Sequence, residues 1–484
     1  GGPMTCRTRI TGLFVLSALC SAAQNENGVW LFNNTMGVDF MTTPPDILTN
    51  YTGFWGNTAV ICDGNGDLML YSDDTRILNG QDQVLVNGDG LFNSIYTNTT
   101  QSSMILPWPG HPGSYYMIQP YPWNLNDPVA HTYYHRIDMN AGGGIGQVME
   151  KNIILADSTG AYMTAVLDSA GTGIWVILHH LNAPRFMAYH LDDSGLSTTP
   201  MITGIGIPVE STSPYQAIGM IRPSPHGERL YLNKLYNNVL NNALIHQMDF
   251  NRTTGEVSNH ITFKGPTSGY HGMEISPSGQ FLYYVTYVCD SGIASRLWQY
   301  DISSGDSATM HDSRALVYEA PITPGGCMGK IGNLALAVDG RIYCAVSNAQ
   351  FLGVINQPDL PAPACEYLHH GLYLDGDTSW MWLPNQMREY PIGIPDVVGD
   401  HKGPATLRIR PNPSRDGCRI TLPGTGIRHL SIVDATGRLV REIPCVAGQG
   451  EVRMDRGDLR GGIYRVVARN GDGCMEAAGR VVFE

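Results

Sequence analysis

Short stretches of alternating apolar and polar residues, separated by turn residues, recur along most of the chain. One kind begins with glycine and continues as an aromatic-rich strand, as in Gly227-Glu228-Arg229-Leu230-Tyr231-Leu232. This pattern is typical of a tight β-hairpin followed by a strand. Five further copies begin at Gly66, Gly113, Gly173, Gly279 and Gly340, so the 274 residues from the first copy to the last make five steps of about 55 residues.

A second marker repeats with the same period. It is an alternating strand that ends in aspartate, at Asp138, Asp192, Asp249 and Asp301, with spacings of 54, 57 and 52 residues. No apolar pattern of period 3.6 reaches the length of a helix in this region. Two independent markers therefore indicate repeated units of several short strands.

These units predict a β-propeller, because a small sheet cannot cover its own faces and must stack on its neighbours in a closed ring. Residues 24–394 number 371, and 371 divided by 55 gives about 6.8, so we expect seven blades, although the count also allows six or eight. Joining the chain ends would complete the last blade, with Gly28–Phe32 pairing near Gly371–Leu374. A long β-sandwich with accidental periodicity is the alternative.

Composition agrees with an all-β chain of at least two domains. The 484 residues are 43% hydrophobic, and Gly 56 and Pro 30 occur without a three-residue period, which excludes collagen and indicates many turns. Residues 401–484 hold fourteen Lys/Arg and nine Asp/Glu, a charge of +5; the total of −13 then leaves 16 against 34, or −18, for residues 1–400. A body with this negative charge repels phosphate backbones, so we expect no nucleic-acid partner.

The beginning of the chain predicts export. Arg7 and Arg9 precede an apolar run, Ile10–Leu19, and small residues follow, so residues 1–23 are expected to form a leader and signal peptide cleaved between Ala23 and Gln24. That run is too short to span a bilayer, and no other stretch is long enough. Lipidation of Cys20 is the alternative, although Leu19 precedes it where a small residue is needed. The eight remaining cysteines do not define a disulfide pairing.

The last 80 residues contain an ordered set of motifs. These are Ile409-Arg410-Pro411-Asn412-Pro413, a segment from Ile432 to Val440 that contains Asp434, Gly437 and Arg438, and a segment from Leu459 to Val467 that contains Gly462, Ile463 and Tyr464. Together they resemble the type A C-terminal sorting domain of the type IX secretion system of Bacteroidota. The resemblance implies a small β-sandwich over residues 405–484, after a linker at 395–404. It also implies recognition by that machinery at the outer membrane, then removal, with release of the body or its attachment to surface lipopolysaccharide.

The body has a family likeness of its own. Asn140–Asn152, Met273–Gly279 and the stretch from Cys365 to Asn385 are similar to secreted propeller proteins of Bacteroidota that carry type IX sorting signals. Such proteins are described as associated with gliding or with the cell surface. This likeness implies no particular chemistry.

Candidate sites for chemistry are weak. Asp63, Asn65 and Asp67 alternate oxygen ligands as in a calcium loop, but Leu68 stands where that loop needs glycine, so a carboxylate-rich hairpin explains them as well. His179-His180 and His369-His370 are neighbours on strands and point to opposite faces, which does not chelate a metal. We therefore expect no cofactor, with calcium as the one open alternative. No GxSxG, HExxH or SxxK set with plausible partners is present.

Aromatic residues are the remaining candidates for ligand binding. Trp108, Trp123 and Tyr133 lie in a Pro-rich region, and Trp380 and Trp382 are two apart, so they would share one face of a strand. Rings on a propeller surface can stack on sugars or anchor a protein, although packing between blades uses the same residues.

The sequence thus predicts an exported propeller at the cell surface or outside the cell. Its expected function is non-catalytic binding of a protein or a glycan, and no catalytic residue is assigned. A secreted glycan-active hydrolase or lyase, with acidic residues in the axial pocket, is the alternative.

Overall fold

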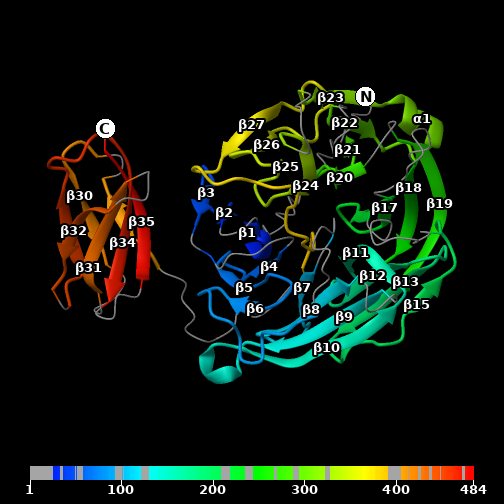
Figure 1. Cartoon of the computed structure of the whole chain (residues 1–484), viewed down its shortest axis with the longest axis horizontal. Coiled ribbons are helices and arrows are strands. Elements are labelled where there is room, and N and C mark those ends of the chain that lie inside the picture. The colour runs from blue at the N-terminus through cyan, green and yellow to red at the C-terminus, as the bar shows by residue number, and fades with distance from the viewer. Residues whose placement is uncertain are drawn as a thin grey trace, which may run out of the picture.

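A computed structural model of the 484-residue chain shows an almost wholly β structure (Figure 1). The structure describes residues 25–32, 36–49, 51, 58–92, 101, 103–121, 130–208, 219–234, 244–265, 270–286, 294–321, 328–390, 405–411, 414–422, 427–434, 439–446, 448–470 and 475–483. Within these ranges, no helix has the length and apolar character needed to cross a membrane.

Seven small antiparallel sheets follow one another between residues 29 and 373 of the described chain, and we number them 1 to 7 in chain order. The first strand of each sheet lies nearest the centre of the ring (Figure 1). This arrangement is a β-propeller, and seven sheets are compatible with the seven blades expected. Sheet 1 comprises β1 (Val29–Phe32), β2 (Met36–Asp39) and β3 (Asp46–Leu48), sheet 2 comprises β4 (Ala59–Cys62), β5 (Leu68–Ser72) and β6 (Ile77–Asn79), and the short helix η1 (Asn25–Asn27) precedes them.

The next two sheets have longer strands. Sheet 3 comprises β7 (Met104–Pro107), β8 (Ser114–Tyr121), β9 (His131–Asp138) and β10 (Gln147–Asp157), with the 3-10 helix η2 (Gly142–Gly144) before its last strand. Sheet 4 comprises β11 (Thr159–Leu167), β12 (Ile174–His180), β13 (Phe186–Asp192), β14 (Gly195–Leu196) and β15 (Met201–Thr203), of which the last two both pair with β13.

The last three sheets have four strands each. Sheet 5 comprises β16 (Gly219–Pro223), β17 (Arg229–Lys234), β18 (Leu244–Asn251) and β19 (Glu256–Lys264). Sheet 6 comprises β20 (Tyr270–Ile275), β21 (Phe281–Thr286), β22 (Arg296–Asp301) and β23 (Ala315–Glu319), with the helix α1 (Ser307–Asp312) before β23. Sheet 7 comprises β24 (Ile331–Leu336), β25 (Ile342–Val346), β26 (Phe351–Ile355) and β27 (Tyr367–Tyr373).

Both sequence markers occupy fixed places in this architecture. The six marker glycines lie in or beside the turn between the first and second strands of sheets 2 to 7. The marker aspartates Asp138, Asp192 and Asp301 end the third strands of sheets 3, 4 and 6, and Asp249 lies near the end of β18. The period of about 55 residues in the sequence is therefore the spacing along the chain from one sheet to the next.

Apolar cores lie between neighbouring sheets and follow the ring around. One cluster joins sheets 1 and 2, one joins sheets 2, 3 and 4, and three more join sheets 4 to 5, 5 to 6 and 6 to 7. A sixth cluster packs Trp30 and Val38 of sheet 1 against Tyr343 and Leu352 of sheet 7. Each sheet thus buries its faces against its neighbours, which is the physical reason for the closed arrangement.

The predicted mode of closure was wrong. Among the described residues, β1 pairs with β2 and β27 pairs with β26, so the two chain ends do not share a sheet. The first and last sheets meet through side chains instead. The seventh sheet, which the glycine marker did not reveal, is sheet 1 at the start of the chain.

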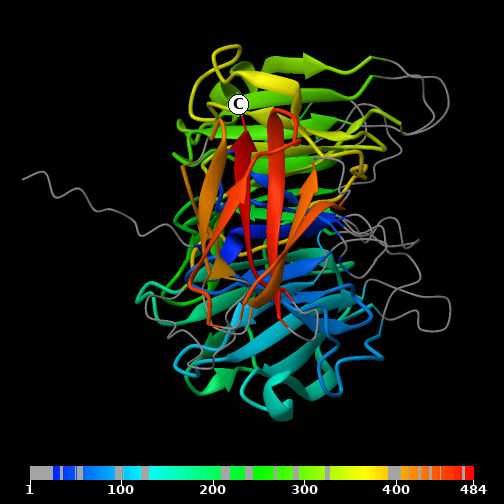
Figure 2. The same ribbon diagram turned by 90° about the vertical axis from the view of Figure 1, so that its left-hand side faces the viewer.

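Residues 405–483 form a separate pair of sheets with a core of their own (Figure 2). The core contains Ile409, Ile420, Ile432, Val466 and Val481, which alternate along their strands, as expected for two sheets packed face to face. One sheet has the order β28 (Ala405–Thr406), β35 (Met475–Phe483), β34 (Gly462–Asn470), β31 (Ile427–Asp434) and β32 (Leu439–Pro444), and the other β29 (Arg408–Arg410), β30 (Gly417–Thr421) and β33 (Glu451–Asp455).

Candidate functional site

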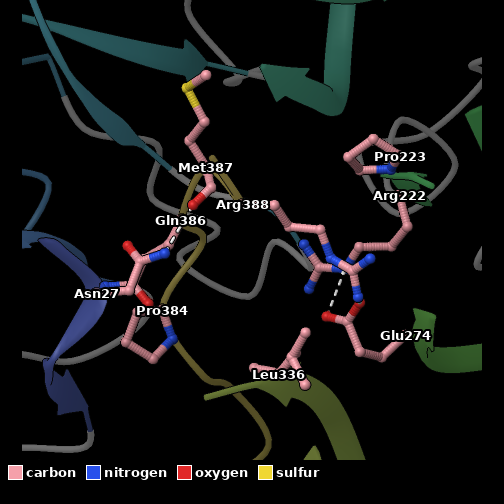
Figure 3. A pocket seen from close by; sticks show the side chains of 10 residues that line it. Asn27, Arg222, Pro223, Glu274, Leu336, Pro384, Gln386, Met387 and Arg388 are labelled. Carbon is pink, nitrogen blue, oxygen red and sulfur yellow. Dashed lines mark hydrogen bonds and ion pairs between the residues drawn. The ribbon is translucent and has the colours of Figure 1, made fainter. Parts of the chain in front are cut away.

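A small pocket lies near the axis of the ring, where the first strands of three sheets meet a segment from the end of the body (Figure 3). Its free volume is about 30 Å³, far below the several hundred Å³ of a site for a drug-sized ligand. The lining residues are Asn27 from η1, Arg222 and Pro223 from β16, Glu274 from β20, Ala335 and Leu336 from β24, and Pro384, Gln386, Met387 and Arg388 from the segment after sheet 7.

The repeat brings three of these lining residues to equivalent positions. Arg222, Glu274 and Ala335 each stand five residues before the hairpin glycine of their own sheet, which is Gly227, Gly279 and Gly340 respectively. Equivalent positions of successive first strands converge on the axis of a propeller. The charged side chains of sheets 5 and 6 therefore meet there.

A carboxylate held between two guanidinium groups dominates the pocket. Glu274 Oε1 lies 2.9 Å from Nη2 of Arg388, and Glu274 Oε2 lies 3.5 Å from Nε of Arg222. Figure 3 shows both guanidinium groups beside the carboxylate. The side chains of Glu274 and Arg222 are only 5% and 9% exposed, so these charges depend on one another for compensation.

Arg222 also connects neighbouring first strands through hydrogen bonds. Its Nε donates to the carbonyl oxygen of Met273 at 3.1 Å, its Nη2 to that of Leu334 at 3.3 Å, and its Nη1 to Oδ1 of Asn385 at 3.3 Å. Burial lowers the pKa of Arg222 and the charge of Glu274 opposes that shift, but a guanidinium stays protonated in proteins. One side chain of sheet 5 thus contacts sheets 6 and 7 and the axial segment.

Residues 379–390, which we call the axial segment, run from sheet 7 toward the start of the chain. The backbone N–H of Asn333 in β24 donates to the carbonyl oxygen of Met381 at 2.8 Å. At the other end, Nδ2 of Asn27 donates to the carbonyl oxygen of Met387 at 2.7 Å, and the hydroxyl of Tyr390 donates to Oδ1 of Asn27 at 2.7 Å. The segment therefore links sheets 5, 6 and 7 to the residues that precede sheet 1.

This pocket does not present the groups that glycan hydrolysis uses. A glycosidase needs two carboxylates facing one cleft, and Glu274 is the one carboxylate among the described residues that line the pocket. Both oxygens of Glu274 already face cations, and its Oε1 also accepts the backbone N–H of Ile275 at 2.8 Å. The arrangement can hold charge and position backbone, and it offers no pair of general acid and base.

The predicted aromatic candidates fall into different environments. Trp108 packs between sheets 3 and 4, where it stacks on His111 at 3.9 Å and donates from Nε1 to the carbonyl oxygen of Asp192 at 3.0 Å. Tyr133 is buried against Phe92 and Tyr121. Trp123 lies outside the described residues.

The two tryptophans of the axial segment differ from each other. Trp380 is 41% exposed, whereas Trp382 is 5% exposed and belongs to the core between sheets 6 and 7. The prediction that they share a face of one strand was wrong, because neither lies in a strand. Of the described aromatic candidates, Trp380 alone is exposed.

Sequence reasoning missed a second exposed ring, which lies at the same end of sheet 7 as Trp380. Tyr373, at the end of β27, is 59% exposed. The N–H of Leu374 donates to the carbonyl oxygen of Gln350 at 3.0 Å, and the N–H of Ser379 donates to that of Ala349 at 2.7 Å. Both rings therefore belong to one end of sheet 7. We call Tyr373 and Trp380, with the exposed polar residues Gln350, His370 and Asp375 of the same sheet end, the aromatic rim.

The metal candidates remain without support from geometry. Oδ1 of Asp63 accepts the backbone N–H groups of Asn65 and Asp67, both at 2.9 Å, so the carboxylate closes the β4–β5 hairpin. Within the described ranges, no group of three or more His, Cys, Asp or Glu residues is arranged to hold a metal ion. Calcium at this loop stays a prediction.

The sorting motif residues are distributed over the second pair of sheets. Pro411 follows β29, Asp434 ends β31, and Gly462, Ile463 and Tyr464 begin β34. The hydroxyl of Tyr464 donates to the carbonyl oxygen of Arg460 at 2.9 Å. Asn412, Pro413, Gly437 and Arg438, and the predicted cleavage site at Ala23 and Gln24, lie outside the described residues.

The fold and the two-sheet tail place this chain among β-propeller proteins with an appended β-sandwich. Residues 408–481 match the family of secretion system C-terminal sorting domains. The tail is therefore a sorting domain of the type IX secretion system of Bacteroidota, as its motifs predicted, and the chain is exported to the cell surface or the extracellular space. Among curated proteins, none matches this chain.

Solved structures that resemble the chain are distant. A putative 6-phosphogluconolactonase from Bacteroides uniformis has 10% identity and a TM-score of 0.43, over 72% of this chain and 97% of that one. The β-propeller domain of Cps50 (Swd1) from Myceliophteria thermophila has 11% identity and a TM-score of 0.37, over 66% and 94%. Hsv2 from Kluyveromyces lactis has 9% identity and a TM-score of 0.35, over 68% and 90%.

Proposed function

We propose that the exported propeller is a non-catalytic binding module whose ligand is a glycan, held at the aromatic rim. The observation that carries this proposal is the pair of exposed rings, Tyr373 and Trp380, at one end of sheet 7. Aromatic faces stack on the apolar faces of sugar rings, and neighbouring amide, imidazole and carboxylate groups can exchange hydrogen bonds with hydroxyls.

The axial pocket supports a non-catalytic role. The axial segment lines this pocket, and the free volume of about 30 Å³ is too small for a sugar. Binding at an outer end of a sheet leaves this interior undisturbed. A protein ligand at the same rim is the competing outcome.

The test is a glycan array and a turnover assay on the exported chain, from residue 24 onward, with Tyr373→Ala, Trp380→Ala and the double variant. Each lost ring should weaken binding roughly fivefold, which corresponds to about 1 kcal/mol. Phe92→Ala is the matched control, because the Phe92 side chain is 49% exposed on a different part of the propeller. Its glycan affinity should equal that of the wild type.

Three results would contradict the proposal. Wild-type affinity in the double variant would place the ligand elsewhere. Saturable binding of proteins without any glycan on the array would favour the protein ligand. Release of shortened glycan products would favour the hydrolase or lyase.

A further inference from the structure

The charges that line the axial pocket do not balance. Arg222 and Arg388 supply two positive charges and Glu274 supplies one negative charge, which leaves a net charge of +1 among the described lining residues. A largely buried charge without a counter-charge is costly. A negative occupant would remove that cost.

Two hydrogen-bond donors of this lining also lack a protein acceptor. Nη1 of Arg388 and Nε2 of Gln386 are shielded from solvent, and within the described structure neither has a hydrogen-bond partner. Their residues line the same pocket. Buried polar groups are nearly always paired, so a particle bound in this pocket would satisfy both groups. Because both groups only donate, that particle must accept.

We propose that the axial pocket binds one small inorganic anion of halide size, held by Arg388 and Gln386. The free volume of about 30 Å³ is on the scale of one water molecule or one halide ion. The anion neutralises the second guanidinium, which Glu274 alone cannot do. It therefore fastens the axial segment to the first strands of sheets 5 and 6.

The test measures the melting temperature of the exported chain at constant ionic strength while chloride or bromide replaces gluconate. A specific site gives a rise that saturates with halide concentration, because a ligand that binds only the folded state stabilises it by mass action. Bromide soaked into crystals should give an anomalous peak at the pocket, next to Arg388.

Two variants shift the halide response in opposite directions. Gln386→Leu removes one donor and should raise the half-saturating halide concentration about tenfold. Glu274→Gln removes the competing negative charge and should lower it. Gln357→Leu, at an exposed glutamine after β26 of sheet 7, is the matched control and should leave it unchanged. If Gln386→Leu does not fold, the opposite shift in Glu274→Gln still decides the question.

The proposal is overturned if the melting temperature is the same in chloride and in gluconate, or if the pocket shows a water without an anomalous bromide peak. It is also overturned if Glu274→Gln folds and needs more halide than the wild type. None of these outcomes bears on the aromatic rim, which is tested by glycan binding.

Discussion

The substitution Glu274→Gln tests whether the buried ion pairs at the axis hold the ring together. Glutamine keeps the volume and one carbonyl oxygen but removes the charge that Arg222 and Arg388 share. The two salt-bridge distances are 3.5 Å to Arg222 and 2.9 Å to Arg388, and the side chains of Glu274, Arg222 and Arg388 are 5%, 9% and 15% exposed. The two guanidinium groups would then face each other without their carboxylate.

The expected cost is about 3 kcal/mol of the free energy of unfolding. Removing one partner of a buried ion pair costs about 3–5 kcal/mol, because the other charge stays buried without compensation. The amide can still accept the N–H of Ile275, and Arg388 is partly exposed, so the lower end of this range applies. A loss of that size is a large part of the stability of a typical domain.

Calorimetry should resolve the effect within one protein. The propeller and the sorting domain have separate cores, so we expect Glu274→Gln to lower the unfolding transition of the propeller and to leave that of the sorting domain in place. A double-mutant cycle with Arg388→Met isolates the pair, and we expect a coupling of at least 1 kcal/mol. The matched control is Glu256→Gln, at an exposed position of β19.

The reasoning is refuted if Glu274→Gln changes the stability by less than about 0.5 kcal/mol, the range of ordinary surface substitutions. A coupling energy of zero in the cycle would show that the contact between Glu274 and Arg388 does not stabilise the fold. Either result would show that the charges at the axis are solvated rather than interdependent.

Three further predictions follow from other parts of the structure. Gly332→Ala should lower the melting temperature of the propeller, because a Cβ there would lie 2.4 Å from the carbonyl oxygen of Met381 and overpacking costs about 1–3 kcal/mol; Gly204→Ala, which meets nothing within 4 Å, should not. Burial raises the pKa of Asp74 from 3.8 to about 7. Between these two values the folded state holds a proton on Asp74 that the unfolded state has lost, so the free energy of unfolding falls as pH rises from about 4 to 7. Asp74→Asn should therefore stabilise the chain by roughly 4 kcal/mol at pH 8 and by little at pH 4 in thermal melts. Deleting residues 405–484 should trap the propeller in the periplasm, and cell fractionation that finds the truncated chain on the surface would contradict the sorting role.

The repeat and the tail could be predicted because both depend on local sequence. A hairpin needs glycine where the backbone turns, as at Gly227 and Gly279 with φ of 71° and 76°, so the period of the sheets appears directly in the sequence. Sheet 1 escaped this signal because the three residues between β1 and β2 include no glycine. The count then placed the missing blade at the joined ends of the chain.

The axial pocket could not be predicted from local patterns. Arg388 lies in a segment without alternation, and its partner Glu274 is 114 residues away, so their contact exists only in the closed ring. A signal for Arg222 and Glu274 was nevertheless present. Each is a charged residue in an apolar first strand, at the same distance from its hairpin glycine, where a residue facing its neighbours' cores would be apolar.

The mode of closure explains why the axis and the rim differ in character. Because β1 and β27 belong to different sheets, no ladder of backbone hydrogen bonds between described residues joins the first blade to the last. Side-chain packing between sheets 1 and 7 and the axial segment must supply that stability instead. The axial segment lies near the centre of the propeller. Moving it away to admit a substrate would break these contacts and destabilise the closed arrangement. We therefore expect a large ligand to bind away from the axis, as proposed for the exposed residues Tyr373 and Trp380.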